Sequence, residues 1–288
     1  AIGDSKTPLK IVFAAVILNS VLDPIFIKTL GLGVNGAAIA TILSQGVSFF
    51  LGLYYVLKNR LAPFTRPSLP GKKEVLVILK LGIPSGLQMS VISAGIAAIM
   101  SVINSFGGVV VSGFSAAQRL DGLIMLPAQA LGTAVTSIAG QNIGVKKWDR
   151  VFKVAKYGFI YNFTTMVFIA LIVNIFAQPA IRLFIKEVDS VAFGTMYLKT
   201  IAFFYPFLGI NFVLNGVVRA SGAMYQVLIL NIISFWVLRY PLTATFSSVF
   251  GERGIAFGIG TSFVISSIIA FLYFRFGKWK TMDLFDSK

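Results

Sequence analysis

Residues 8–29 read PLKIVFAAVILNSVLDPIFIKT, an apolar run that carries a single carboxylate, Asp23. A helix needs roughly 20 predominantly apolar residues to cross the hydrocarbon core of a bilayer. The run is apolar on all faces, and it does not alternate as a strand of a membrane barrel would. This stretch therefore predicts a helix that spans a membrane.

Seven further runs of the same kind follow along the chain. Together with the first, the predicted spans are residues 8–29, 34–57, 76–105, 114–143, 154–178, 190–217, 224–248 and 254–277. The expected fold class is therefore an all-α integral membrane protein with eight transmembrane helices.

The overall composition excludes an ordinary soluble domain. Of the 288 residues, 57% are hydrophobic and 12% are charged, with a mean hydropathy of +0.86. Soluble domains are about half apolar and about a quarter charged. The net charge of +15 does not indicate nucleic-acid binding, because the charges fall between the apolar runs and not along one polar helix face. The expected partner is the lipid bilayer, with no nucleic acid.

The residue types that enzymes use most often are missing from the sequence. It contains no cysteine and no histidine, which removes disulfides, thiolate metal sites and the commonest general base. One isolated carboxylate inside a span provides neither a nucleophile–base pair nor a metal cluster. There is also no Gly-rich phosphate-binding loop that ends in Lys-Ser/Thr. We therefore expect no enzymatic activity and no cofactor.

The connections between the runs alternate in charge. The basic side of the chain comprises Lys58, Arg60, Arg66, Lys72, Lys73, Lys80, Lys146, Lys147, Arg150, Lys153, Lys156, Lys278, Lys280 and Lys288. The connection 105–113, on the opposite side, has no charge. Because Lys and Arg accumulate in cytoplasmic loops, the C-terminus is predicted to be cytoplasmic. The polar, Pro-rich stretch 59–75 is typical of a linker.

The two ends of the chain carry an internal repeat. Residues 33–38 read GVNGAA and residues 251–256 read GERGIA, and each stretch opens an apolar run. Asp23-Pro24 and Tyr240-Pro241 precede them, so that the offset between the copies stays near 218 residues. Parallel repeats of this kind occur in transporters.

The repeat predicts an architecture larger than eight helices. The second copy follows four earlier spans, so symmetry predicts four spans before the first copy, and the chain opens at Ala1 without a methionine. The expected protein has twelve helices in two lobes, and this chain is expected to be a fragment that lacks roughly the first four. Residues 1–58 would then be the last two helices of the N-lobe, 59–75 a cytoplasmic linker, and 76–288 a six-helix C-lobe with a short cytoplasmic tail.

Asp23 is the one carboxylate that the sequence places well inside a predicted span. An ionisable group at such a depth is costly and is by default a functional hypothesis. Asn19 lies four residues earlier, so the two side chains share a helix face. Such oxygen donors suit sodium better than zinc or copper. The alternative is a buried polar pair that joins helices by hydrogen bonds.

Other polar and aromatic side chains within the runs are candidates for a substrate cavity or for gating. Arg119 and Asp121 lie near the predicted start of the fourth run. One interpretation is a plain interfacial charge cluster, and the other, a gate at a helix mouth, is what the family resemblance given below implies. Aromatic faces attract cations, although aromatic residues in spans mostly pack or face lipid. The candidates are Gln88, Gln118, Arg119, Asp121, Tyr205 and Asn211.

Six short motifs, in this order and spacing, resemble the multidrug and toxic compound extrusion (MATE) family over essentially the whole chain. They are GDSKTPL at 3–9, LDPIF at 22–26, GVNGAAIAT at 33–41, GQNIG at 140–144, RASG at 219–222 and GERG at 251–254. The resemblance implies two six-helix lobes around a V-shaped cavity. It also implies export of organic, often cationic, compounds driven by inward sodium or proton flow.

The resemblance also implies a site for the coupling cation. One branch of the family uses an acidic residue on the first helix, an Asn and an Asp four apart on the fifth, and a Thr on the sixth. Asn19, Asp23 and Thr41 match the last three, and they would bind sodium if the protein is sodium-coupled. Residues 76–105 and 190–217 lack the carboxylates that other branches use, so a coupling site in the C-lobe is not expected.

The expected function is therefore a sodium- or proton-coupled antiporter in the plasma (inner) membrane that exports organic, cationic or amphipathic compounds. The alternative is a lipid-linked oligosaccharide flippase of a related two-lobed type. Such flippases carry several basic residues in the cavity, for which Arg119 and Arg239 are the candidates here. The coupling ion and small organic substrates are the expected ligands, and no obligatory protein partner is evident.

Overall fold

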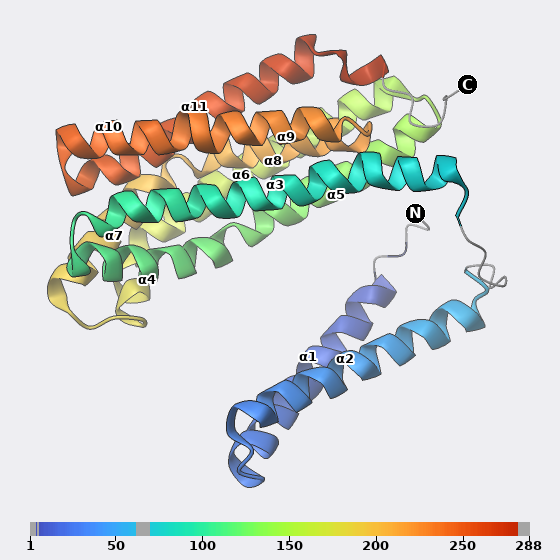
Figure 1. Ribbon diagram of the computed structural model, residues 1–288, viewed down its shortest axis with the longest axis horizontal. Helices are drawn as coiled ribbons and strands as arrows, with labels where there is room; N and C mark the ends of the chain where they lie inside the picture. The colour runs from blue at the N-terminus through green and yellow to red at the C-terminus, as the bar shows by residue number, and fades with distance from the viewer. Residues whose placement is uncertain (1–3, 5, 62–69, 282–288) are drawn as a thin grey trace. The chain divides into compact units, whose positions relative to one another are not determined.

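The structure is a computed structural model that describes residues 4, 6–61 and 70–281. It divides into two units, Ala1–Pro70 and Gly71–Lys288, which are called here the N-terminal unit and the C-terminal unit (Figure 1). Every secondary-structure element in the described ranges is a helix. The predicted all-α class is therefore confirmed.

The N-terminal unit is a helical hairpin. It consists of α1 (Lys6–Pro24), a π-helical turn η1 (Ile25–Thr29) and α2 (Gly33–Lys58). The chain reverses direction at Gly31 and Gly33, whose φ values are +65° and +53°. Only glycine adopts this left-handed region without a steric cost, so these two residues make the tight turn possible.

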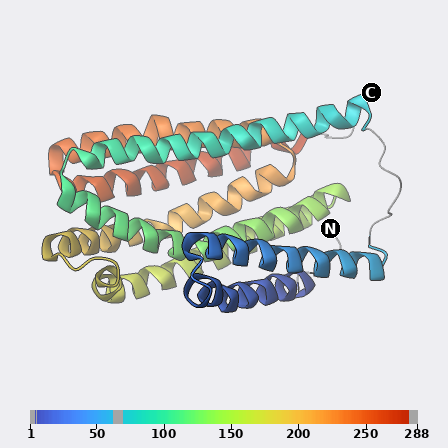
Figure 2. The same ribbon diagram turned by 60° about the horizontal axis from the view of Figure 1, so that its bottom comes forward.

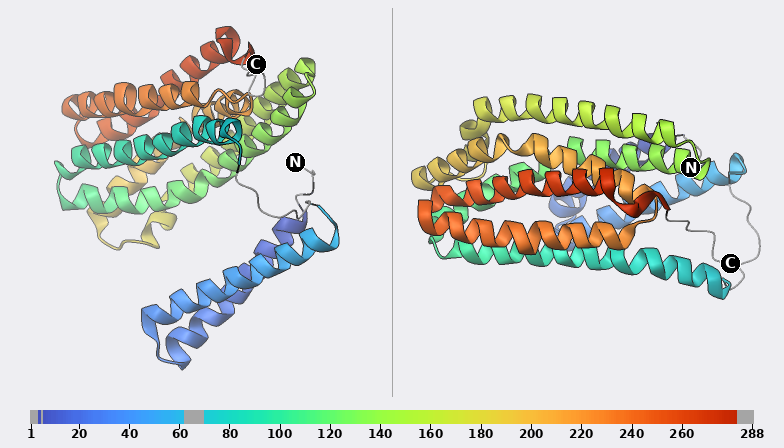
Figure 3. Two further views of the ribbon diagram at one scale, coloured as in Figure 1. Left: turned by 45° about the vertical axis from the view of Figure 1, so that its right-hand side comes forward. Right: turned by 90° about the horizontal axis from the view of Figure 1, so that it is seen from above.

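The C-terminal unit contains the remaining helices. They are α3 (Lys72–Asn104), α4 (Gly108–Ile124), α5 (Leu126–Gly144), α6 (Trp148–Arg182), α7 (Val188–Ala202), α8 (Tyr205–Ala220), α9 (Met224–Ile232), η2 (Ile233–Arg239), α10 (Tyr240–Phe250), α11 (Glu252–Phe276) and the short η3 (Lys278–Thr281). The long helices run side by side along one common direction, as Figures 2 and 3 show from further angles.

Proline accounts for the breaks within single spans. Pro24 ends α1, Pro127 follows the break between α4 and α5, Pro206 follows that between α7 and α8, and Pro241 follows η2. Proline has no N–H to donate to the preceding turn, and its ring clashes with the carbonyl four residues back. The α7–α8 pair is bent by 53°.

Within the described ranges, seven helices are long and apolar enough to cross a membrane, and the bent α7–α8 pair makes up to eight. Three of the described spans, α3, α4 and α6, begin at least four residues earlier than predicted; α6 begins at Trp148 and not at 154. α3 begins at Lys72 and not at 76, because the Glu74 carboxylate accepts the N–H of Gly71 at 2.9 Å and caps a polar first turn. α4 begins at Gly108 and not at 114, which places its later residues deeper in the span.

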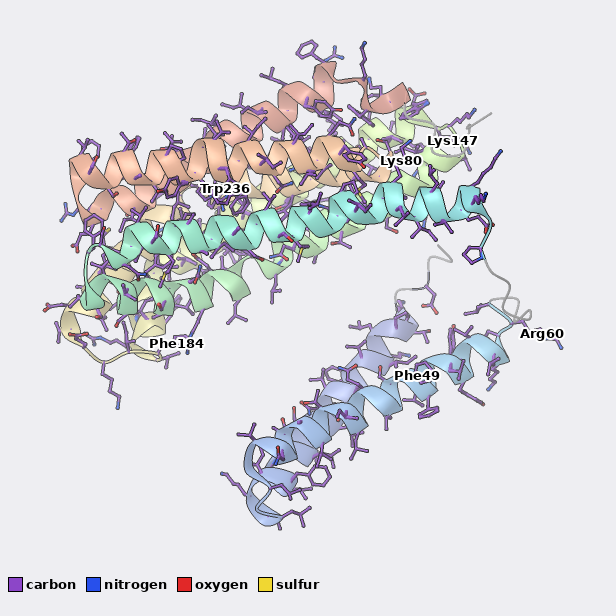
Figure 4. The ribbon with its side chains drawn as sticks, viewed as in Figure 1. Phe49, Arg60, Lys80, Lys147, Phe184 and Trp236 are labelled. Carbon is purple, nitrogen blue, oxygen red and sulfur yellow. The ribbon has the colours of Figure 1, made fainter. Side chains whose placement is uncertain are left out.

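Parts of two predicted segments lie outside the described residues. They are positions 62–69 of the expected linker 59–75 and positions 282–288 of the expected tail. Because α3 already contains residues 72–75, the described part of the linker is shorter than predicted. In the C-terminal unit, Lys80 and Lys147 lie toward one end, and Phe184 lies at the other (Figure 4).

Small residues allow the helices of the C-terminal unit to approach closely. A Cβ added to Gly113 on α4 would lie 2.5 Å from the carbonyl oxygen of Ser190 on α7, and one added to Gly194 would lie 2.8 Å from that of Gly113. Within a bilayer, helix association depends on this kind of close packing because lipid is as apolar as the helices.

The two members of the internal repeat share their turn geometry. Gly33 and Gly251, which are 218 positions apart, both have positive φ; Gly33 is the first residue of α2, and Gly251 directly precedes α11. A Cβ added to Gly36 would lie 2.7 Å from the carbonyl oxygen of Phe26, and one added to Gly254 would lie 2.0 Å from that of Phe246. The sequence repeat is therefore also a repeat of close helix contacts. Superposition of the complete hairpins stays a prediction.

The carboxylate of Asp4 links the start of α1 to the end of α2. It accepts the N–H groups of Lys6 and Thr7 at 3.1 Å and the Tyr55 hydroxyl at 2.9 Å. Hydrogen bonds from the side chain and N–H of Thr7, followed by that from Tyr55, lower the pKa of Asp4 to about 2. Because this is below the ordinary value of 3.8, the link stabilises the hairpin above roughly pH 4 and is lost as the pH falls through about 2.

Tyr55→Phe is expected to raise the pKa of Asp4 toward its ordinary value, because the variant removes one donor to the carboxylate. An NMR titration of isotope-labelled aspartate measures this pKa. Tyr54→Phe is the matched control, since the Tyr54 ring lies against Lys58 and not against Asp4. An unchanged pKa in Tyr55→Phe would show that the contact does not form.

Candidate functional site

The N-terminal unit contains a small polar groove between α1 and α2, with a volume of about 100 Å³. Its lining combines apolar and polar side chains: Val12, Ala15, Val16, Asn19, Thr41, Ser44, Gln45 and Ser48. Two of the three predicted cation ligands, Asn19 and Thr41, therefore lie in one groove.

Asp23, the third predicted ligand, lies one turn beyond the groove on α1. It is half-buried, and its carboxylate accepts the Asn19 Nδ2 at 3.3 Å. The Thr41 hydroxyl donates to the carbonyl of Ala37 at 2.9 Å, which leaves its oxygen lone pairs available. The spacing of four residues between Asn19 and Asp23 thus brings the two side chains into contact, as helical geometry requires.

The C-terminal unit contains a much larger cavity, of about 580 Å³. Side chains from α3, α4, α5, α7, α8, α9, η2 and α11 line it. The polar part of the lining is Gln88, Gln118, Asp121, Gln129, Thr133, Thr136, Tyr197, Asn211, Asn215, Arg219, Asn231, Ser234, Arg239 and Ser266. Aromatic lining residues are Phe114, Phe212, Phe235 and Phe263. Such a volume and such a mixture of groups are typical of small-molecule sites.

Four of the six predicted cavity residues line this space: Gln88, Gln118, Asp121 and Asn211. The Asn215 Nδ2 donates to the Asn211 amide oxygen, and the Asn215 amide oxygen is buried without a donor in the described structure. That oxygen can accept a hydrogen bond from a bound compound.

Tyr205 does not line the cavity but lies directly behind its wall. Its side chain is fully buried, and its hydroxyl donates to the Asp121 carboxylate. Tyr205 therefore orients Asp121, and it does not offer a ring to a bound compound.

The prediction that Asp121 lies near a helix mouth is wrong. Because α4 begins at Gly108, Asp121 is thirteen residues into the helix and contacts Tyr205 of α8. The statement that Asp23 is the one carboxylate well inside a span is wrong for the same reason. The predicted start at 114 left out the apolar residues Val109, Val110 and Val111, which belong to the first turn of α4.

Arg119 lies outside the cavity, although its neighbour Gln118 lines it. The guanidinium of Arg119 is exposed and lies 5.9 Å from the centre of the Phe184 ring. Adjacent helical residues point about 100° apart, so the rotation of α4 decides which of the two faces the cavity. The expected placement of Arg119 in the cavity is therefore wrong.

Two arginines that line the cavity were underrated by sequence reasoning, which ranked carboxylates first. Arg219 lies at the end of α8, where its Nη2 is 3.4 Å from the Gln88 Oε1. Arg239 ends η2, inside the predicted span 224–248. The sequence marks Arg239 as a candidate basic residue of the cavity, and its place in the lining agrees with that; Arg219 was not among the candidates.

These features define a multi-pass helical membrane protein whose C-terminal unit encloses a polar and aromatic cavity large enough for a small organic molecule. The model of the MatE family matches residues 84–245, more than half of the chain. The chain belongs to this family, the MATE transporters, whose members are multi-pass proteins of the inner membrane and not enzymes.

Known relatives agree with this assignment. The probable multidrug resistance protein YpnP of Bacillus subtilis (strain 168) is 59% identical over the whole chain. A Vibrio cholerae MATE transporter, VcmN in the bent form, matches 95% of the chain with a TM-score of 0.88 at 22% identity, which shows the fold alone. A transporter of the MOP superfamily from Pyrococcus furiosus matches 93% with a TM-score of 0.82 at 28% identity.

The chain covers only part of each of these proteins. It spans 65% of the length of YpnP, 62% of VcmN and 61% of the Pyrococcus furiosus transporter.

Proposed function

We propose that this protein is a cation-coupled antiporter that exports amphipathic organic compounds across the cytoplasmic membrane. The observation that carries the proposal is the cavity of about 580 Å³ within a bundle of membrane-spanning helices. Its amides, hydroxyls and aromatic rings can bind compounds of many shapes, since none of these groups demands one partner. The 59% identity to a probable multidrug resistance protein supports the same function.

Asp23, Asn19 and Thr41 are the proposed coupling residues. The carboxylate of Asp23 binds either a proton or, together with the Thr41 hydroxyl and the amide oxygen of Asn19, a sodium ion. In the structure the Asn19 amide nitrogen donates to this carboxylate at 3.3 Å. Binding of the cation replaces that donor, so the contact between α1 residues changes with occupancy. Such a change can bias the hairpin between two conformations.

The finer architecture belongs to the same proposal. Residues 1–58 are the last two helices of an N-lobe, 59–75 contain the cytoplasmic linker, and 76–288 form a C-lobe whose C-terminus is cytoplasmic. The equivalent close contacts at Gly36 and Gly254 support a twofold repeat. The position of Lys80 and Lys147 toward one end of the C-terminal unit supports the orientation (Figure 4).

A lipid-linked oligosaccharide flippase is the second candidate. Arg219 and Arg239 in the cavity favour it, because basic side chains recognise the phosphates of such lipids. The Pyrococcus furiosus transporter is also described as having a binding pocket of reverse polarity that suggests a different function. The exporter is preferred because the cavity also contains Asp121 and uncharged amides, which suit a wider range of compounds.

Transport by the full-length protein, reconstituted in vesicles, tests the proposal. An amphipathic fluorescent dye is enclosed, and sodium and pH gradients are imposed separately. Export of the dye against its concentration gradient is expected when one of the two, the sodium gradient or the pH gradient, is imposed. No such export is expected when both gradients are absent. Absence of export under both gradients would contradict the antiporter, and movement of a labelled lipid-linked sugar alone would favour the flippase.

A further inference from the structure

The cavity of the C-terminal unit contains more positive than negative charge. Its charged lining residues are Arg219, Arg239 and Asp121. Asp121 accepts the hydroxyl of Tyr205, and no ion pair joins it to either arginine in the described structure. The two guanidinium groups therefore face the cavity without a carboxylate partner, which is an expensive arrangement at membrane depth.

Two aromatic rings cover the faces of the Arg239 guanidinium, while most of its N–H donors have no acceptor in the described structure. Its guanidinium carbon lies 3.9 Å from the centre of the Phe235 ring on η2 and 4.7 Å from that of Phe263 on α11. Its Nε donates to the Ser262 hydroxyl at 3.2 Å. The rings stabilise the charge through its faces, but they accept none of its in-plane N–H groups. Of the five donors of a guanidinium, four thus have no acceptor among the residues described here.

The element that carries Arg239 supports a binding role. η2 is a π-helical segment inside an otherwise α-helical span, and such segments are rare and often occur at functional sites. It also places Ser234 on the cavity wall, where the Ser234 hydroxyl accepts that of Ser266 at 2.8 Å. A guanidinium and two hydroxyl-bearing side chains thus belong to one wall, formed by η2 and α11.

Arg219 supplies a second, more adjustable cation. Its side chain is exposed to the cavity, and its contact with the Gln88 amide oxygen is long at 3.4 Å. A hydrogen bond of that length is weak, so an anion can displace Gln88 at little cost.

We propose that this cavity binds the acidic group of an amphipathic compound, with Arg239 as the anion-binding residue and Arg219 as a second contact. The ligand class is an organic phosphate, sulfonate or carboxylate, because these groups accept paired N–H donors from a guanidinium. The apolar part of the compound packs against Phe114, Phe212 and Phe263. This inference rests on the proposed function, since it names the substrate class of the exporter.

A purely structural role for Arg239 explains less. Stacking between Phe235 and Phe263 would fill space equally well with a leucine or methionine, and the exchange would remove a costly unpaired charge. An anion in the cavity would account both for the free donors of Arg239 and for a second cation, Arg219, in the same lining.

The test is a binding measurement on the whole chain in nanodiscs of phosphatidylcholine. Naphthyl phosphate and naphthylmethylamine, which share a ring and differ in charge, are titrated by calorimetry. Naphthyl phosphate is expected to bind roughly tenfold more tightly, because hydrogen bonds to charged groups are worth about that factor. Arg239→Gln should weaken naphthyl phosphate roughly tenfold and leave naphthylmethylamine unchanged, whereas Arg239→Lys should retain part of the affinity.

Arg275→Gln is the matched control. Arg275 also lies over a ring, that of Phe276, but it is exposed and does not line the cavity. Naphthyl phosphate should bind this variant as it binds the unchanged chain. The inference is overturned if naphthylmethylamine binds the unchanged chain as tightly as naphthyl phosphate does. That comparison needs no variant and so does not depend on how Arg239→Gln folds.

Two further arms identify the source of the anion and separate this inference from the proposed function. If inorganic phosphate competes with naphthyl phosphate, the result supports a soluble anion as the natural ligand. If naphthyl phosphate binds more weakly in nanodiscs of phosphatidylglycerol, the result supports a lipid headgroup as the natural ligand. Either outcome supports the anion site. Vesicle export that fails while naphthyl phosphate binds contradicts the exporter and not the anion site. Cationic dye export that persists in Arg239→Gln, together with no preference for naphthyl phosphate, overturns the anion site and leaves the exporter intact.

Discussion

Asp23→Asn is expected to abolish export against a gradient while the protein still reaches the membrane and still binds substrate. The substitution keeps the shape of the side chain and its contact with Asn19, which lies 3.3 Å away, but it removes the ionisation. Moving one charge through 100 mV supplies about 2.3 kcal/mol, equal to roughly a fiftyfold concentration ratio. In Asp23→Asn the ratio of dye concentrations across the membrane should fall toward one.

The measurement is dye export from vesicles, with the amount of inserted protein determined in parallel. Asn19→Ala and Thr41→Ala should weaken the ion dependence less severely, because each removes one uncharged oxygen donor. Asp149→Asn is the control, since Asp149 is an exposed carboxylate in the first turn of α6. Export by Asp23→Asn at the normal rate against a gradient would contradict the coupling role of Asp23. Loss of folding would favour the alternative, a polar pair that joins helices.

The depth of Asp121 makes a second arm of this experiment necessary. Asp121 is also a carboxylate inside a span, but it lines the larger cavity and accepts the Tyr205 hydroxyl. Asp121→Asn is expected to alter substrate affinity and to preserve the dependence on the ion gradient. If Asp121→Asn loses that dependence and Asp23→Asn keeps it, the coupling site lies in the C-terminal unit.

Gly254→Ala is expected to lower the melting temperature by about 5 to 10 °C, since overpacking costs roughly 1 to 3 kcal/mol or more. The new Cβ would lie 2.0 Å from the carbonyl oxygen of Phe246 and 2.3 Å from its carbonyl carbon. These are backbone atoms of the preceding helix, so α10 and α11 must separate to admit the methyl group.

Thermal unfolding in detergent checks this expectation. Gly86→Ala on α3 is the control, because a Cβ there has nothing within 4 Å and alanine favours the helix. Gly36→Ala should disturb the N-terminal hairpin in the same way as Gly254→Ala disturbs α10 and α11, given the equivalent contact with Phe26 at 2.7 Å. A melting temperature for Gly254→Ala equal to that of the unchanged chain would show that the helices do not need this close contact.

The sequence was sufficient for the all-α class and, to within one, for the number of spans in the described residues. A bilayer requires each crossing segment to be long, apolar and internally hydrogen-bonded, and these are local properties that a single sequence displays. The contact between Asn19 and Asp23 was predictable for a similar reason, because a spacing of four residues places two side chains on one face of any α-helix.

Helix starts were less predictable because averaged hydropathy is insensitive to capping. The polar first turn of α3 counts against a span, yet Glu74 caps it through the N–H of Gly71. The predicted start of α4 omitted residues 108–113, among them Gly113, which packs closely against α7. A late start for α4 in turn gave Asp121 the wrong depth.

Only the tertiary structure decided which side chains meet in the larger cavity. The sequence marks Gln118 and Arg119 as equally polar neighbours, but the rotation of α4 directs one into the cavity and the other toward Phe184. The sequence marks Arg239 as a possible cavity residue, but only the structure shows that Phe235, Phe263 and Ser262 surround it. The chemistry that defines spans is local to each residue along the chain. The chemistry that defines the cavity depends on how packed helices are rotated against one another, and that is settled by contacts between residues far apart in sequence.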